Sequence, residues 1–256
     1  MTKGTDDLLI VTQPGWLGLT LNRPEAKNAL NTALLAQLAD ALDVAARDTS
    51  CHAVLLGGSD GNFAAGADIG EIATKTSAEG AIDPRKDSWS RIRAFPKLLV
   101  AAVDGFCLGG GFELALMADC IVLGETAKLG LPETNLGLIP GAGGGQRLTA
   151  LAGRARANRM ILTGEIIDAS TAFDWGIAAW KVAGSALPDA ERLCVKLAAR
   201  APLALQAAKR AIVAADESTL PFALERQAFE ALLDSQDKAE GIAAFRDKRK
   251  PEFKGQ

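Results

Sequence analysis

The chain has 256 residues, of which 48% are hydrophobic and 23% charged, a balance typical of a soluble globular protein rather than a disordered one. Its formal net charge of −3 lacks the basic excess that nucleic-acid-binding proteins usually carry. No apolar stretch approaches the roughly 18 residues of a membrane span, and the N-terminus turns acidic before any apolar run, so neither a membrane segment nor a secretory signal is predicted.

The first half of the chain alternates short apolar runs with helix-like segments. Leu8–Val11 and Trp16–Leu21 flank a Pro-Gly pair and predict a hairpin. Asn31 is suited to cap a helix whose apolar residues keep helical spacing. Residues 71–95 predict a loop with a helix, and residues 112–118 a second helix. Buried strands are predicted at residues 53–56, 98–103 and 121–123. This alternation predicts an α/β core.

The strand pattern stops after about residue 186. Residues 189–247 are rich in Ala, Leu, Lys, Arg and Glu, and Pro202 and Pro221 mark the expected first turns of new helices. We therefore divide the chain into a core with the active site, residues 1–188, and a helical C-terminal region, residues 189–256.

The thiols and the single imidazole exclude several mechanisms. None of the four cysteines has CxxC spacing, which predicts reduced thiols in a cytoplasmic-type compartment and no zinc site. The only histidine, His52, lies between an apparent helix end and an apolar strand. A serine or cysteine nucleophile is therefore disfavoured, because it needs a placed base. The chain contains no tyrosine, which excludes tyrosine as a catalytic acid.

Three glycine-rich stretches are candidates for chemistry: residues 63–68, 108–113 and 140–146. None is followed by the Gly-Lys-Ser/Thr of a P-loop, and none matches G-x-G-x-x-G between a strand and a helix. Glycines alone more often mark tight turns or close backbone packing, and this alternative holds for any one of these loops.

Two glutamates beside these loops favour function. Glu113 is the only carboxylate in residues 105–118, and Glu133 is the only charged residue in residues 129–146. An unpaired buried carboxylate is costly, so its pKa rises and it can exchange protons near neutral pH. One such glutamate would more often cap a helix or pair with arginine, but two of them suit acid–base chemistry at carbon.

Gly110 adds a third component. A helix that begins near Gly110 would present unsatisfied amides at the positive end of its dipole. A partner amide from residues 65–67 would complete an oxyanion hole of two donors. Such a hole stabilises an enolate or a tetrahedral oxyanion by roughly 3–4 kcal/mol per donor.

Together these residues resemble the enoyl-CoA hydratase/isomerase (crotonase) family. The matching stretches are LNRPEAKNAL (21–30), FAAGADI (63–69), AAVDGFCLGGGFELALMADC (101–120), LGLPETNLGLIPGAGGGQRL (129–148) and GIAAFRDKRKPEF (241–253). The resemblance implies a crotonase-like α/β spiral of repeated ββα units. It also implies a C-terminal helical region that builds homotrimers, often paired into hexamers.

The resemblance further implies roles for individual residues. Ala67 and Gly110 would donate their amides to the thioester oxygen, and Glu113 and Glu133 would be the two catalytic glutamates. Gly141 would position substrate or water through its backbone.

Another group of residues would lie at the CoA. Ala65 and Asp68 belong to the loop that borders it, and Lys27 would replace a basic residue that many relatives carry near the CoA phosphates. Phe245 and Lys248 match positions that reach the CoA of a neighbouring subunit, with Lys248 near the 3′-phosphate.

The implied reaction is the reversible syn addition of water to a trans-2-enoyl-CoA, which gives a 3-hydroxyacyl-CoA. Glu113 is expected to be the base and Glu133 the acid. No metal or redox cofactor is expected, and CoA enters as part of the substrate.

The alternatives are a Δ3,Δ2-enoyl-CoA isomerase of the same family, which needs only one base, and a non-catalytic acyl-CoA- or RNA-binding member. The sequence leaves both fatty-acid and aromatic-acid catabolism open.

Overall fold

The computed structural model describes residues 7–73, 76–217, 236–237, 240, 244, 247 and 249–256. Its centre is a six-stranded sheet of order β1-β2-β3-β4-β6-β9, and a second sheet has the order β5-β7-β8. The strands are β1 (Leu8–Gln13), β2 (Trp16–Leu21), β3 (Ala53–Gly58), β4 (Leu98–Val103), β5 (Phe106–Leu108), β6 (Cys120–Leu123), β7 (Lys128–Gly130), β8 (Ile166–Asp168) and β9 (Trp180–Lys181).

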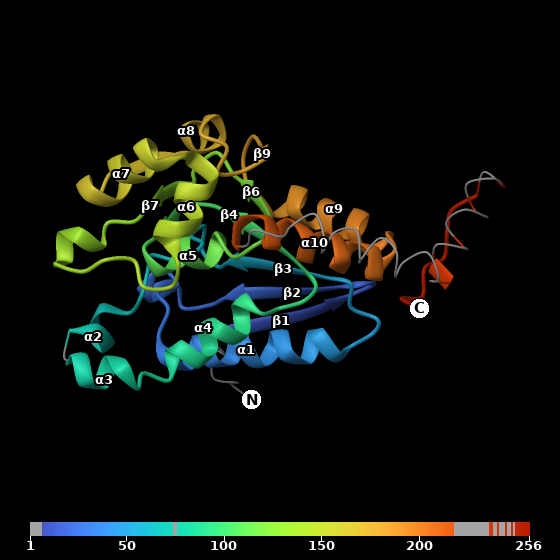
Figure 1. Cartoon of the computed structure of the whole chain (residues 1–256), viewed down its shortest axis with the longest axis horizontal. Coiled ribbons are helices and arrows are strands. Elements are labelled where there is room, and N and C mark those ends of the chain that lie inside the picture. The colour runs from blue at the N-terminus through green and yellow to red at the C-terminus, as the bar shows by residue number, and fades with distance from the viewer. Residues whose placement is uncertain are drawn as a thin grey trace.

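Helices cover the six-stranded sheet on both sides (Figure 1). They are α1 (Thr32–Arg47), α2 (Ile69–Ile72), α3 (Ser77–Ala81), α4 (Arg85–Arg93), α5 (Gly110–Ala115), α6 (Gly144–Ala152), α7 (Arg154–Thr163), α8 (Ala169–Asp174), α9 (Leu187–Ala198) and α10 (Pro202–Glu217), with 3₁₀ turns η1 (Pro24–Ala26) and η2 (Glu133–Leu136). None of the described helices is both long and apolar enough to cross a membrane.

The sheet follows the predicted apolar runs. β1 and β2 pair antiparallel with Gln13 opposite Trp16, so the predicted hairpin is confirmed. From β2 to β9 the neighbouring strands run parallel. All six residues of β4 are buried, as expected for a strand in a parallel sheet with both faces covered.

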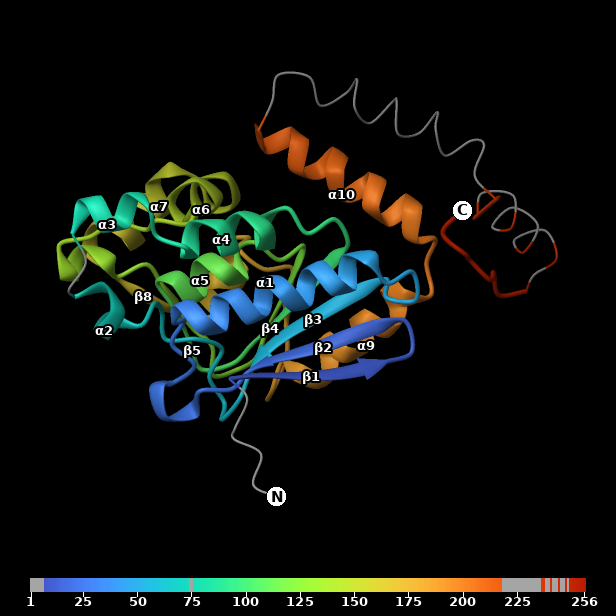
Figure 2. The ribbon, with the colours of Figure 1, turned by 90° about the horizontal axis from the view of Figure 1, so that it is seen from below.

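Two apolar layers hold the helices to the sheet. α1 buries its apolar stripe on one face, and the Asn31 side chain caps it by accepting a hydrogen bond of 2.7 Å from the Leu34 amide, as predicted. On the other face, Ala190 and Cys194 of α9 join a second buried cluster with Trp16. Figure 2 shows α1 and α9 on opposite sides of the strands.

The structure refines several sequence predictions. Residues 71–95 contribute to three helices, of which α4 is the longest. α5 spans Gly110–Ala115, so it begins at Gly110 as the oxyanion-hole hypothesis expects, although the apolar run predicted a helix over residues 112–118. Gly109 at φ 49° turns the chain directly from β5 into the helix. α10 begins at Pro202 as predicted, whereas Pro221 lies outside the described residues. The boundary after residue 188 stays a prediction.

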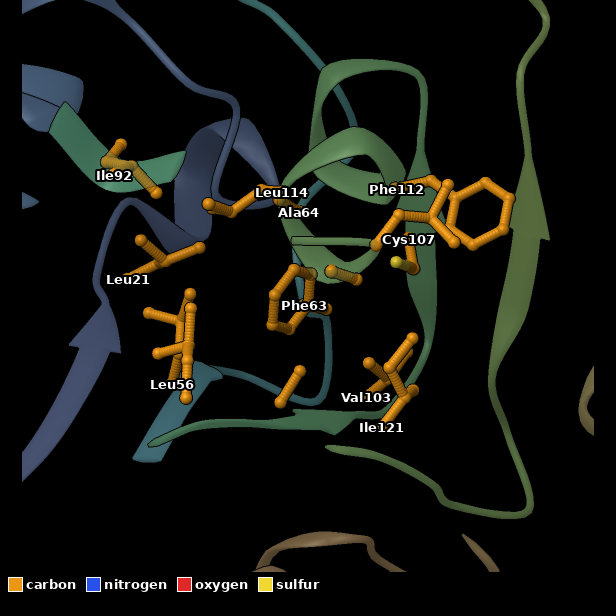
Figure 3. Close-up of a cluster of buried hydrophobic side chains, with 14 of the residues drawn as sticks. Leu21, Leu56, Phe63, Ala64, Ile92, Val103, Cys107, Phe112, Leu114 and Ile121 are labelled. Atoms are coloured by element: carbon orange, nitrogen blue, oxygen red, sulfur yellow. The ribbon is translucent and has the colours of Figure 1, made fainter. Parts of the chain in front are cut away.

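Phe63, the first residue of the glycine-rich stretch 63–68 after β3, lies in the middle of the larger core (Figure 3). It is fully buried, with Leu56 on one side and Cys107 on the other. A large side chain in such a position fixes the loop by filling the space beneath it.

Phe63→Ala should lower the free energy of unfolding by about 3–5 kcal/mol, because it removes buried apolar surface and leaves a cavity. Urea denaturation followed by circular dichroism measures the loss. Val44→Ala on the exposed face of α1 is the control and should change stability by less than about 0.5 kcal/mol. A loss below about 1 kcal/mol for Phe63→Ala would show that the core closes around the cavity.

Candidate functional site

The candidate site lies where the chain leaves two parallel strands. Residues 63–68 follow β3, and β5 with α5 follows β4. An isolated bridge joins the two segments: the Ala64 amide donates to the Phe106 carbonyl (2.9 Å), and the Leu108 amide donates to the Ala64 carbonyl (3.0 Å). The carboxyl ends of parallel strands are the usual place for ligand binding in α/β sheets.

Two backbone amides come together in these segments. A Cβ added at Gly110 would lie 3.4 Å from the Ala67 nitrogen, so the two residues are close neighbours. The hydrogen bonds of the described residues give neither amide an acceptor. Gly110 is the first residue of α5, where a helix leaves its amides free. In the described part of the chain the two amides are thus neighbours without acceptors, and their role as donors to a thioester oxygen stays a prediction.

The first glutamate is buried and held by backbone amides. Glu113 lies in the first turn of α5 and is only 4% exposed. Its Oε1 accepts hydrogen bonds from the Ala142 amide (2.6 Å) and the Gly144 amide (2.9 Å). A Cβ at Gly144 would lie 2.9 Å from Glu113 Cγ, so the loop reaches the carboxylate only because this residue is glycine.

The second glutamate has no such support. Glu133 begins η2, and its Oε1 lies 3.2 Å from the position that a Cβ on Gly109 would occupy. Its Oε2 is buried and has no hydrogen-bond partner among the described residues. Burial raises the pKa of Glu133 to about 7, and the charge of the nearby Glu113 adds to the rise. An unsatisfied buried oxygen of this kind indicates a place for substrate or water.

The two carboxylates can therefore do different work. Glu113 is fixed by two amides, while Glu133 keeps its proton to near-neutral pH. Titratable groups whose environments differ in this way are typical of an acid–base pair. Beside them lie two amides able to bind a carbonyl oxygen, so the site is suited to proton transfer next to a polarised carbonyl group.

The sequence missed the residues that hold Glu113. The amides that reach Glu113 belong to Ala142 and Gly144. Gly141 is exposed, and the contact of its backbone with substrate or water stays a prediction. The signal was the uncharged glycine-rich run 141–145, but a sequence alone does not say which amide of such a run points at which side chain.

The residues predicted to contact CoA are partly described. The Lys27 ammonium lies 4.6 Å from the centroid of the Phe106 ring, and the Lys27 carbonyl accepts a bond of 2.9 Å from the Ala65 amide. Asp68 lies next to Ala67, but its carboxylate forms an ion pair with Arg23. Phe245 and Lys248 lie outside the described residues. The CoA roles of all these residues stay predictions.

The single histidine lies away from these groups. His52 precedes β3, at the opposite end of that strand from the site, and its Nδ1 lies 2.9 Å from the Ala198 carbonyl oxygen. Within the described ranges, no group of three or more His, Cys, Asp or Glu side chains is arranged to hold a metal ion.

The chain is similar in sequence to known enoyl-CoA hydratases. The family model described as enoyl-CoA hydratase/isomerase matches residues 12–256. The 2,3-dehydroadipyl-CoA hydratase of Escherichia coli (strain K12) is 47% identical over 97% of this chain and 99% of its own length. A probable enoyl-CoA hydratase of Rhizobium meliloti (strain 1021) is 44% identical over 97% of this chain and 98% of its own.

Solved structures show the same fold. Subunit I of an enoyl-CoA hydratase from Geobacillus kaustophilus HTA426 superposes with a TM-score of 0.93 at 37% identity, covering 98% of this chain and 99% of that one. An enoyl-CoA hydratase from Bacillus anthracis gives 0.92 at 34% identity, covering 98% and 100%. The chain therefore belongs to the enoyl-CoA hydratase/isomerase family, and the predicted crotonase-like α/β fold and hydro-lyase class of enzyme are confirmed.

Proposed function

We propose that this enzyme adds water across the C2–C3 double bond of a trans-2-enoyl-CoA thioester. The observation that carries the proposal is a pair of carboxylates beside two unused amides: Glu113 is buried, and Glu133 is half-buried with one buried oxygen. Glu113 lies in the same helix as the Gly110 amide, Glu133 approaches the preceding Gly109, and Ala67 is the neighbour of Gly110. A hydratase needs one group to take a proton from water and another to give a proton to carbon, and the site offers both.

The proposed mechanism uses each group once. The Ala67 and Gly110 amides bind the thioester oxygen, which withdraws electrons from the double bond and makes C3 electrophilic. Glu113 takes a proton from water while the oxygen of that water forms a bond to C3. The electron pair of the double bond moves toward the thioester, and Glu133 delivers its proton to C2. The product is a 3-hydroxyacyl-CoA. Glu113 then carries the proton that it took from water and Glu133 lacks the proton that it gave to C2, so loss of a proton from Glu113 and uptake of one by Glu133 restore the starting state.

The rival activities use less of this site. A Δ3,Δ2-enoyl-CoA isomerase needs one base to move one proton. A second partly desolvated carboxylate would then lower the stability of the fold without taking part in the reaction. A non-catalytic acyl-CoA-binding protein would need neither glutamate. Binding of RNA is disfavoured by the net charge of −3.

We further propose that the acyl chain ends in a second carboxylate. The support is the 47% identity to a relative named for 2,3-dehydroadipyl-CoA, a substrate whose acyl chain has that feature. A terminal carboxylate distinguishes such a substrate from ordinary fatty acyl thioesters, and a role in catabolism that yields dicarboxylic acyl-CoA is part of this proposal.

Assembly into a trimer or hexamer belongs to the same proposal. Ile212 and Val213 of α10 are exposed, and a neighbouring subunit would cover this apolar surface. In that assembly Phe245 and Lys248 would reach the CoA bound to the neighbour.

Glu113→Gln and Glu133→Gln should each lower kcat by about 10² or more, because each removes one proton-transfer group without changing the shape of the side chain. Loss of absorbance of the conjugated enoyl thioester measures the rate. Glu165→Gln, in an exposed ion pair with Arg159, is the control and should hydrate at the normal rate. Near-normal hydration by either active-site variant would overturn the mechanism with two glutamates.

The pH profile should report the state of Glu133. The active form carries the proton on Glu133, whose pKa is about 7, so kcat/KM should fall above pH 7 by about tenfold per pH unit. The kcat/KM for dehydration should fall in the same way above pH 7. The ratio of the two kcat/KM values equals the equilibrium constant, which does not depend on pH because the reaction takes up or releases no net proton. The residual activity of Glu133→Gln should lack the limb, whereas a flat wild-type profile above pH 7 would contradict the assignment.

A matched pair of substrates tests the acyl chain. 2,3-Dehydroadipyl-CoA and trans-2-hexenoyl-CoA both have six acyl carbons and differ only in the terminal carboxylate. The proposal expects a kcat/KM at least about tenfold higher for the dicarboxylic substrate, which corresponds to about 1.4 kcal/mol of discrimination. Equal values would remove the terminal carboxylate from the proposal and leave hydration itself untouched.

A further inference from the structure

The segment 21–30, which carries part of the family resemblance, lies against the loop of the oxyanion hole. The Ala65 amide donates to the Lys27 carbonyl (2.9 Å), and the Leu30 amide donates to the Gly66 carbonyl (2.8 Å). Two residues after Gly66, the Asp68 amide donates to the Leu30 carbonyl (3.0 Å). Residues on both sides of residue 67 are therefore fixed to this segment.

The amide between them is left free. A parallel bridge pairs Leu30 with Ala67, but the hydrogen bonds of the described residues give the Ala67 amide no acceptor. Its direction is consequently set by the peptides on either side rather than by a bond of its own. An amide that must meet a substrate oxygen needs this kind of external support.

The side chains of Arg23 and Asp68 form a clamp between the segment and the loop. Arg23 Nη1 and Nη2 each donate to Asp68 Oδ2 (3.1 Å), and Nη1 also donates to the Ala29 carbonyl (2.6 Å). Asp68 Oδ1 accepts from the Gly70 amide (3.1 Å) at the start of α2. The side chains of Arg23 and Asp68 are 15% and 26% exposed. The clamp thus joins the segment to the residue that directly follows Ala67.

The arginine is itself anchored. Its own amide donates to Asn28 Oδ1 (2.9 Å), and Asn28 Nδ2 donates to the Ser59 and Asn62 carbonyls (2.9 and 2.7 Å). Asn28 is fully buried and adopts φ 59°, a left-handed conformation that asparagine tolerates better than most residues. The backbone of Arg23 is therefore held in place by the buried Asn28, and its guanidinium binds Asp68 from this fixed position.

The alternative role for Asp68 is a contact with CoA. Its carboxylate already receives the Arg23 guanidinium and the Gly70 amide. A carboxylate is also a poor partner for the anionic phosphates of CoA, since like charges repel. These two points favour an indirect role.

We propose that Arg23 and Asp68 are positioning residues that aim the Ala67 amide at the thioester oxygen. The inference rests on the proposed function, because it assigns the pair to the oxyanion hole of the hydration reaction. Loss of the clamp lets the loop rotate and weakens an interaction that strengthens in the transition state. The effect should therefore appear in kcat and leave binding of the nucleotide part of CoA intact.

Asp68→Asn and Arg23→Lys test the clamp. Asparagine can still accept from the Gly70 amide, and lysine keeps the charge but loses the fork of two donors. Each should lower kcat by about tenfold with little change in KM, a fraction of the 10²–10³ that a lost oxyanion donor costs. The double variant Arg23→Gln/Asp68→Asn should lose no more than Arg23→Gln alone, because either single change already breaks the pair.

Two binding measurements separate positioning from CoA contact. Free CoA has no thioester carbonyl, so calorimetry should give the same affinity for wild type and both variants. A chromophoric enoyl-CoA should show a smaller shift of its absorption to longer wavelength in the variants, since the shift reports polarisation of the carbonyl by the amides. Weaker binding of free CoA with a normal spectral shift would overturn the proposal and assign Asp68 to CoA.

Asp119→Asn provides the matched control. Asp119 pairs with Lys209 at 2.9 Å, and the two side chains are 16% and 11% exposed, a depth similar to that of the clamp. This variant should lower thermal stability and leave both kcat and the spectral shift at wild-type values. Unchanged kcat in both clamp variants would overturn the inference, whereas failure of the wild type to hydrate any enoyl-CoA would overturn the proposed function instead.

Discussion

The burial of one carboxylate governs the layout of the site. A buried carboxylate must receive hydrogen-bond donors, and for Glu113 these are the amides of Ala142 and Gly144. This requirement brings the start of α6 against α5 and excludes a side chain at residue 144. Arg147 Nη1 donates to the Ala142 carbonyl (3.0 Å), so the peptide that holds Glu113 is itself held on its other side. Hydrogen bonds to Glu113 and Arg147 thus hold residues 142–144 in place.

The second carboxylate, Glu133, has a raised pKa, and no backbone amide donates to its buried oxygen in the described part of the chain. Glu133 has a buried oxygen without a partner among the described residues, and burial together with the Glu113 charge raises its pKa to about 7. The same pocket thus gives the two glutamates different environments, one with two amide donors and one without. The difference depends on which backbone amides reach which oxygen, and these amides are placed by the loops that follow the parallel strands.

Local patterns allowed much of the fold to be predicted. The hairpin of β1 and β2, the Asn31 cap of α1 and the limits of β4 follow from turn residues, capping and apolar periodicity, all of which act over a few neighbouring residues. The apolar run 112–118 gave the limits of α5 less well, because the helix starts at the Gly109 turn and ends at Ala115. Glu113 and Glu133 could be singled out because a lone charge in an apolar segment is visible without coordinates.

The sequence by itself determined the α/β class, the family resemblance and the two glutamates. Only the tertiary structure decided what surrounds them. The amides that hold Glu113 lie 29 and 31 residues away along the chain, and the Arg23–Asp68 pair spans 45 residues. The proton affinity of Glu133 depends on how deeply the folded chain buries it. Hydrogen bonds and desolvation act through space over a few ångströms, so residues far apart in sequence set them, and no local pattern records those distances.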